Sequence, residues 1–120
     1  MDQDILMEFA AEWLRDWNNH DLNAIMAHYD GDISFTSPLI KALGFDEKGV
    51  IMDKSILQDY FAAGLKKYPD LHFKLKQVLC GVSSVVLYYE SIGGRLSAEF
   101  MELNVSGKVC RVVAHYATAS

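Results

Sequence analysis

Residues 84–116 of this 120-residue chain, SVVLYYESIGGRLSAEFMELNVSGKVCRVVAHY, decide the fold. Three runs rich in β-branched and aromatic residues are separated here by two turn signals. Gly93 and Gly94 suit the two positive-φ positions of a type I′ hairpin turn, and residues 104–107 supply Asn, Ser and Gly for a second reversal. The pattern predicts an antiparallel meander of three strands, one face of which needs an apolar cover.

The segments before the meander predict the helices that form this cover. Residues 3–18 and 53–68 carry apolar stripes at helical spacing, and a shorter stripe follows Asp21, which can cap a second helix. Residues 33–37 and 50–52 are typical of short strands, residues 30–32 of a break, and residues 71–76 of a strand with one solvent-exposed face. Helices followed by a run of strands indicate an α+β fold, with the helices on one face of a curved antiparallel sheet.

Composition limits the class of protein and its partners. Residues 1–120 show no repeat or linker and are expected to form one domain. A net charge of −5 argues against a nucleic-acid partner. The start of the chain, Met1 to Asp4, is acidic where a signal peptide is basic, and no apolar run approaches the roughly 18 residues of a membrane span. We therefore expect a cytoplasmic protein with no membrane partner.

The two cysteines fit the same compartment. Cys80 and Cys110 lie far apart in the sequence, with no CxxC motif and no histidine at ligand spacing. Each stands beside strand-like apolar residues. The sequence therefore predicts buried free thiols in place of a disulfide, and neither a metal site nor a cofactor is expected.

Strand register decides which residues share a face with Glu99, because side chains of a strand alternate between two faces. A two-residue turn at Gly93–Gly94 places Tyr88 opposite Glu99, and a two-residue turn at Val105–Ser106 places Val112 opposite it. A mostly apolar face with a few convergent polar groups is typical of a small-molecule pocket. The face predicted in this way holds Val86, Tyr88, Glu90, Ser97, Glu99, Met101, Cys110, Val112, Ala114 and Tyr116.

Glu99 and Tyr88 are the candidate catalytic residues on this face. Desolvation would raise the pKa of Glu99 and suit its carboxyl to donate a hydrogen bond or to transfer a proton. The alternative is a carboxylate on the rim or the outer face, bonded to Tyr88 or paired with an arginine. His115 is expected to point away from Glu99, beside Arg111 and Val113, unless a longer second turn shifts the last strand.

Two apolar segments are left without an obvious cover. The outer face of the meander predicts a homodimer, because its apolar patch is larger than a small monomer normally exposes. The residues of this patch are Leu96, Ala98, Phe100, Val109 and Val113. The loop that follows Pro38 is also apolar, from Leu39 to Phe45, and we expect it to close the mouth of the pocket as a lid.

Several of these segments resemble the nuclear transport factor 2-like superfamily, and within it the SnoaL-like proteins and ketosteroid isomerases. The resemblance lies in the helix with Trp13 and Trp17 that leads into residues 19–22, in residues 33–38, in the third helix, and in residues 99–116. It implies a cone-shaped sheet around three helices, a pocket at the open end and, in many members, a dimer. Family members include isomerases, cyclases, hydrolases and proteins without catalysis.

The resemblance also implies roles for three positions. Ser37 stands where ketosteroid isomerases hold an aspartate base, Trp13 where they hold a tyrosine that donates to the oxyanion, and Glu99 where they hold a neutral aspartate. The expected pocket residues are Trp13, Ser37, Met101, Val112, Ala114 and Tyr116. Two functions remain open at this point. One is acid–base catalysis on a small apolar, carbonyl-bearing molecule, and the other is a non-catalytic ligand-binding or dimeric scaffold domain.

Overall fold

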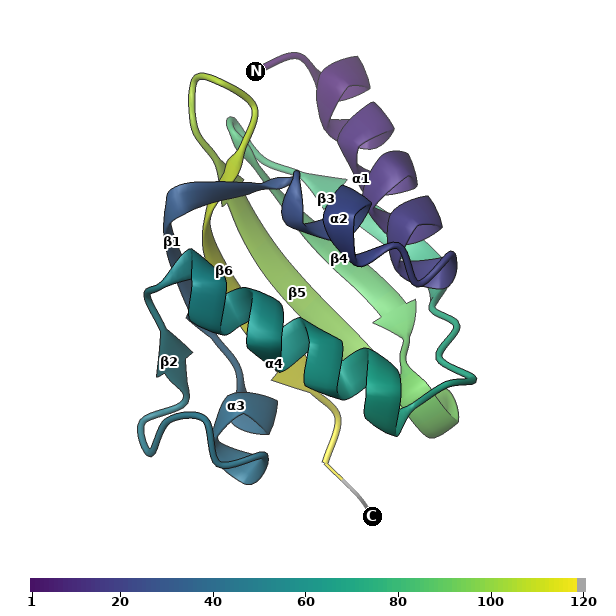
Figure 1. Ribbon diagram of the computed structural model, residues 1–120. Coiled ribbons are helices and arrows are strands. Elements are labelled where there is room, and N and C mark those ends of the chain that lie inside the picture. Colours follow the sequence, from purple (N-terminus) through teal and green to yellow (C-terminus); the bar gives the residue numbers. More distant parts are fainter. Residues whose placement is uncertain (119–120) are drawn as a thin grey trace.

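A curved sheet of six strands wraps around the helices in the computed structural model, which describes residues 1–118 (Figure 1). The strands are β1 (Tyr29–Thr36), β2 (Val50–Ile51), β3 (Lys74–Cys80), β4 (Ser84–Glu90), β5 (Leu96–Leu103) and β6 (Val109–Tyr116). Their order is β2-β1-β6-β5-β4-β3. The predicted α+β class and curved sheet are confirmed. The sheet does not close into a barrel, and β1 runs parallel to β6 where an antiparallel sheet was expected.

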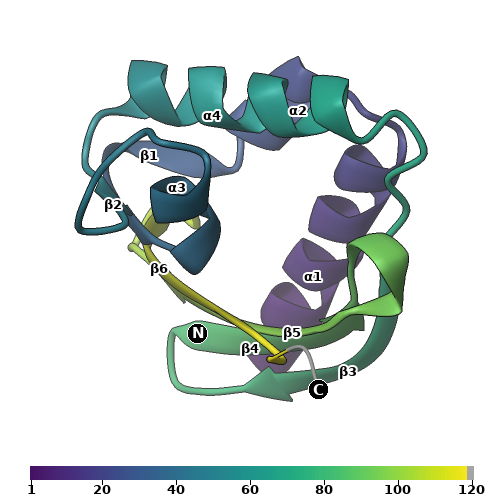
Figure 2. The same cartoon turned by 90° about the horizontal axis from the view of Figure 1, so that it is seen from below.

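Two of the four helices begin directly after Asp21 and Asp53, where the sequence predicts their starts. The helices are α1 (Gln3–Asn18), α2 (Leu22–Met26), α3 (Pro38–Ala42) and α4 (Lys54–Lys67). The Asp21 carboxylate accepts from the Ala24 backbone N–H, and the Asp53 carboxylate caps α4 in the same way. Figure 2 shows α1 and α4 on the concave side of the sheet, with α3 close to β2 and β6.

Helix α3 was not predicted, since residues 39–49 were expected to form a loop. Ser37 is its N-cap, with Oγ accepting from the Leu39 backbone N–H at 3.2 Å, and Pro38 occupies the first turn. Proline is favoured there because the N–H that it lacks has no helical partner. Leu39 and Leu43 thereby face the interior of the molecule, where they pack against the core.

Strand β1 is longer than predicted and passes through the expected break at residues 30–32. Its register with β6 shifts between Tyr29 and Ser34, so the glycine and aspartates are absorbed by an irregularity of the strand. The Asn104 side-chain amide donates to Asp30 at 3.2 Å, which fixes this irregular stretch to the β5–β6 turn.

The cysteines are less buried than predicted, and for Cys80 the reason is its position at the edge of the sheet. Both cysteines are free, but Cys80 is exposed, because it ends the edge strand β3, and Cys110 is half-buried. Cys110 also lies at a register irregularity of the β5–β6 pair and does not share the face of Glu99. Within residues 1–118, no helix is long and apolar enough to cross a membrane.

The core is built largely from aromatic side chains of the helices and the sheet. Trp13 of α1 stacks on Phe73 with ring centroids 5.7 Å apart, and Trp17 meets Phe61 of α4 edge to face at 4.8 Å. Trp13 also donates its indole N–H to the hydroxyl of Tyr29 at 3.0 Å. Both partners of that bond are buried, so the bond satisfies two polar groups that water cannot reach.

Replacing Tyr29 with phenylalanine should therefore destabilise the fold. The buried indole N–H of Trp13 loses its acceptor, which should lower the free energy of unfolding by about 1–3 kcal/mol. Urea denaturation followed by circular dichroism measures the change. Tyr88→Phe is the matched control, because its ring lies on the outer face and is 36% exposed. An equal effect of both substitutions would contradict the role assigned to the Trp13–Tyr29 bond.

Candidate functional site

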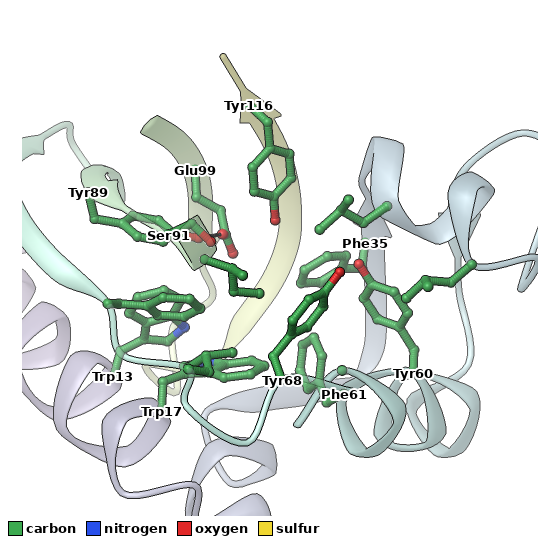
Figure 3. Close-up of a pocket in the computed structure, with 16 residues that line it drawn as sticks. Trp13, Trp17, Phe35, Tyr60, Phe61, Tyr68, Tyr89, Ser91, Glu99 and Tyr116 are labelled. Atoms are coloured by element: carbon green, nitrogen blue, oxygen red, sulfur yellow. Dashed lines mark hydrogen bonds between the residues drawn. The ribbon is translucent and has the colours of Figure 1, made fainter. Parts of the chain in front are cut away.

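An aromatic cavity lies between the concave face of the sheet and helices α1 and α4 (Figure 3). Its volume is about 70 Å³, room for about two water molecules. The walls are mostly apolar, and the lining residues are Trp13, Trp17, Phe35, Leu39, Leu43, Tyr60, Phe61, Gly64, Tyr68, Leu71, Phe73, Tyr89, Ser91, Ile92, Glu99 and Tyr116. Among the described residues, Glu99 supplies the one carboxylate of this lining.

Glu99 reaches the cavity from the middle of β5. Its neighbours across the sheet are Leu87 on β4 and Ala114 on β6, so hydrocarbon lies on both sides. Only 4% of Glu99 is exposed to solvent. The Tyr89 hydroxyl donates a hydrogen bond to Oε1 at 2.6 Å. Oε2, the other carboxyl oxygen of Glu99, receives no hydrogen bond from residues 1–118.

Burial raises the pKa of Glu99 to about 7, because the ionised carboxylate loses its water of hydration. The hydrogen bond from Tyr89 acts in the opposite direction, since it stabilises the charged form. No lysine, arginine or histidine of the described residues lines the cavity to offset the burial. Neutral and ionised Glu99 therefore coexist near neutral pH.

Tyrosine hydroxyls surround the same space. Figure 3 shows the hydroxyls of Tyr116 and Tyr60 pointing into the gap between the sheet and α4. Burial raises the pKa of Tyr60 to about 12, and hydrogen bonding to Ser37 acts against this rise. Burial and the charge of Glu99 raise the pKa of Tyr116 as well. These phenols stay protonated at neutral pH, so they are hydrogen-bond donors toward a ligand.

No metal-binding group occurs in this part of the structure. Across residues 1–118, no three His, Cys, Asp or Glu side chains come together in a way that could hold a metal ion. The polar side-chain groups of the lining residues are one carboxyl, several hydroxyls and two indole N–H groups, of which that of Trp17 is buried with no hydrogen-bond partner among residues 1–118. They suit hydrogen bonding and proton transfer with an organic ligand.

Comparison with known proteins identifies the family. A family model described as the SnoaL-like domain matches residues 10–119. The chain belongs to the SnoaL-like family. No curated protein matches the sequence.

Solved structures of similar fold agree with this assignment. A SnoaL-like protein of unknown function from Burkholderia thailandensis is 34% identical over 98% of both chains, with a TM-score of 0.93. A putative ketosteroid isomerase from Kribbella flavida is 16% identical over 98% of this chain and 81% of that chain, with a TM-score of 0.75. The epoxide hydrolase/cyclase-like enzyme SalBIII, from salinomycin pyran ring formation, is 16% identical over 98% and 94%, with a TM-score of 0.78.

The SnoaL-like cavity differs from the predicted one in its tyrosine. Tyr88 was expected opposite Glu99, but it stands opposite Ala98 on the outer face, and that prediction was wrong. The β4–β5 connection is a three-residue loop, Ile92–Gly94, closed by the Ser91 N–H donating to the Arg95 carbonyl at 2.7 Å. One residue more than a two-residue turn moves every β4 side chain to the other face.

This register brings Tyr89 to the cavity, a residue that the sequence analysis missed. The same shift turns Val86 and Glu90 outward, although both were predicted on the face of Glu99. The run Ile92-Gly93-Gly94 did carry a signal for it, because three-residue hairpin loops end in a glycine with positive φ, and Gly94 has φ 76°.

The remaining predicted pocket residues divide into three groups. Trp13 and Tyr116 line the cavity. Met101, Val112 and Ala114 share the inner face with Glu99 but are packed in the core, and Ala114, not Val112, stands opposite Glu99. Ser37 is 1% exposed and lies outside the lining, where it caps α3. The indole N–H of Trp13 is bound to Tyr29, so it does not act as the ligand donor that the resemblance implied.

Residues on the outer face follow the prediction with one exception. His115 is exposed and stands opposite Ala98, pointing away from Glu99 as expected. Leu96, Phe100 and Val113 are half-buried on that face. Val109 was also predicted there but is fully buried, because the register changes between Glu102 and Leu103.

Titration of Glu99 tests the electrostatics of the cavity. We expect a midpoint near 7 by carbon-detected NMR, and a higher midpoint in Tyr89→Phe, which lacks the hydrogen bond that favours the charged form. Between pH 4.5 and 7 the folded protein keeps a proton that the unfolded chain loses, so stability falls as pH rises. The stability of Glu99→Gln relative to the wild type should then grow by roughly 3 kcal/mol between pH 4 and pH 8.

Glu8→Gln is the control for this measurement, because it removes an exposed carboxylate of helix α1 that lies outside both the cavity and the outer face of the sheet. It should not reproduce the pH-dependent gain of Glu99→Gln. A Glu99 midpoint near 4.5, with no pH-dependent gain from Glu99→Gln, would show that water reaches the carboxylate.

Proposed function

We propose that this SnoaL-like protein binds a small, mainly apolar, carbonyl-bearing molecule in the aromatic cavity, and that Glu99 exchanges a proton with it. The observation that carries the proposal is a buried carboxyl with its pKa raised to about 7 at the cavity wall. A group that is half-protonated near neutral pH can serve as both acid and base. Perturbed carboxyls in apolar pockets are typical of sites of catalysis.

In the proposed reaction, ionised Glu99 removes a proton from the carbon next to the carbonyl group. The Tyr116 hydroxyl, which points into the cavity, donates a hydrogen bond to the carbonyl oxygen as negative charge develops there. Neutral Glu99 then returns the proton to the same carbon or to a conjugated one. The Tyr89 hydroxyl holds Oε1 throughout, so that Oε2 carries the proton.

Proteins of this fold include one described as a putative ketosteroid isomerase and one described as an epoxide hydrolase/cyclase-like enzyme. At 16% identity these likenesses extend to the fold alone, so the carboxyl and hydroxyls of this chain carry the proposal.

A second candidate function is ligand binding without catalysis. It is favoured by Ser37, which cannot take up a proton at neutral pH, at the position where the related isomerases hold their base. The small volume of the cavity, about 70 Å³, points the same way, because known ligand pockets are several times larger. Leu39 and Leu43 of α3 line the cavity and would have to move outward to admit a ring-sized molecule.

Binding and exchange of an aromatic ketone separate the two functions. Acetophenone should quench the fluorescence of Trp13 and Trp17, which line the cavity. Its affinity should fall roughly fivefold from pH 6 to pH 8.5, because a bound apolar ring removes the remaining hydration of ionised Glu99. Glu99→Gln has no ionisable group at this position and should bind with little dependence on pH.

Catalysis is measured on the same complex. In D₂O the wild type should speed the exchange of the ketone methyl protons for deuterium, followed by NMR, and Glu99→Gln should not. Binding without exchange would leave the non-catalytic function, and binding that is indifferent to both pH and Glu99 would reject the role of this residue.

We also propose that a second copy of the chain covers the outer face of the sheet. Phe100 and Val113 lie there half-buried, and Leu79 of the edge strand is 52% exposed. Glu102 and Arg111 stand opposite each other on the same face, so a two-fold axis can bring opposite charges together.

We propose in addition that the protein is cytoplasmic, because both cysteines are free thiols and free thiols are typical of a reducing compartment.

Sedimentation equilibrium at micromolar concentration tests the dimer. The wild type should give about twice the 13.5 kDa mass of the chain. Phe100→Asp places a charge on the patch and should give monomers. Val105→Asp changes the charge equally on the fully exposed 104–107 turn and should leave the dimer intact. A wild-type monomer would show that the outer face is free in solution.

A further inference from the structure

A second, larger groove opens outside the aromatic cavity, between the segment that follows α4 and the loop that joins β4 to β5. Its volume is about 540 Å³, against about 70 Å³ for the cavity. Tyr68, Leu71, Ser91 and Ile92 line both spaces, so the two share a wall. A molecule too long for the cavity has room to extend along this groove.

The groove differs from the cavity in its charge. Lys67, His72 and Lys74 line it, together with Asp70 and Glu90. Glu90 stands opposite Lys74 in the β3–β4 pair and also lies 3.9 Å from Lys76, which stands outside the lining. Three lysines, Lys67, Lys74 and Lys76, thus face two carboxylates at the groove.

This local excess of positive charge is opposite in sign to the net charge of the chain, which is −5. The net charge of the chain therefore repels an approaching anion, whereas the lysines of the groove attract it. Lys67 is placed at the entrance to the cavity, with its ammonium 5.6 Å from the ring centroid of Tyr68, a residue of the shared wall.

We propose that the groove binds the anionic end of an amphipathic ligand whose apolar body lies in the cavity. The inference rests on the proposed function and names its substrate class, an organic anion such as a carboxylate with an apolar ring or chain. Charge sets the direction of binding. The cavity offers an anion no cation and a carboxyl, Glu99, whereas the groove offers Lys67 and Lys74.

A pair of probes with one skeleton tests the assignment. The acid 4-phenylbutyrate and the alcohol 4-phenylbutan-1-ol differ in charge at the end of the chain. The chain has two tryptophans, both in the cavity wall, so their fluorescence reports entry of the phenyl ring, with calorimetry as a second readout. At pH 7 and low salt the wild type should bind the acid roughly fivefold more tightly than the alcohol. High salt should reduce this preference, because exposed charges are screened.

The double variant Lys67→Gln/Lys74→Gln should lose the preference for the acid and keep its affinity for the alcohol. Lys66→Gln is the matched control, because Lys66 is the exposed neighbour of Lys67 but does not line the groove, and it should retain the preference. Equal binding of acid and alcohol by the wild type, or a preference that persists in the double variant, would overturn the groove site and leave the cavity in place. If neither probe binds, the cavity does not admit apolar ligands and the proposed function fails with it.

Discussion

The hydrogen bond from Tyr89 to Glu99 depends on the register of β4 and β5, and a three-residue loop sets that register. Gly93 and Gly94 adopt φ 68° and 76°, a region that other residues enter only at an energetic cost. With one residue fewer in the loop, Tyr88 would face the cavity and Tyr89 would face outward. Ile92 of the same loop lines both the cavity and the outer groove. The backbone geometry of this loop thus determines which tyrosine forms a hydrogen bond with Glu99 in the cavity.

Burial of Glu99 lowers the stability of the fold when the carboxyl is ionised, but it also raises the pKa that the proposed function requires. Its neighbours Leu87 and Ala114 offer no charge and no hydrogen bond, so ionisation costs free energy that a hydrophobic residue would not cost. The aromatic core supplies the compensating stability, through rings that pack on Trp13 and Trp17 from both the sheet and α4. The hydrogen bond from Tyr89 stabilises the ionised carboxylate and so partly offsets the effect of burial. The pKa of Glu99 therefore stays near neutrality, where a carboxyl can both give and take up a proton.

The sequence predicted the fold from local signals that hold in any context. Capping aspartates, apolar stripes and the two turns placed α1, α4 and the strand meander correctly. The inner-face residues of β6 from Val112 to Tyr116 were also predicted correctly, although Glu99 pairs with Ala114 and not with Val112. The turn and the irregularity at Cys110 together shift the β5–β6 pairing by two residues, and such a shift leaves each side chain on its predicted face. The β4 pairing shifted by one residue, so Tyr88 and Tyr89 exchanged faces. A shift by an even number of residues keeps each side chain on its predicted face, whereas a shift by an odd number moves it to the other face. Turn geometry sets this number, and the side-chain pattern does not reveal it.

Ser37 explains why the proposed reaction has a single carboxyl. Its Oγ accepts from the Leu39 N–H that begins α3, and its backbone N–H donates to the Gly49 carbonyl at 2.9 Å. A Cβ at Gly49 would lie 3.1 Å from the Ser37 carbonyl oxygen, so the two segments are tightly packed. The position serves the fold as a cap and has no acid–base capacity at neutral pH. In the proposed reaction, proton transfer therefore falls to Glu99 alone, which suits a reaction in which the proton that is removed is also the proton that is returned.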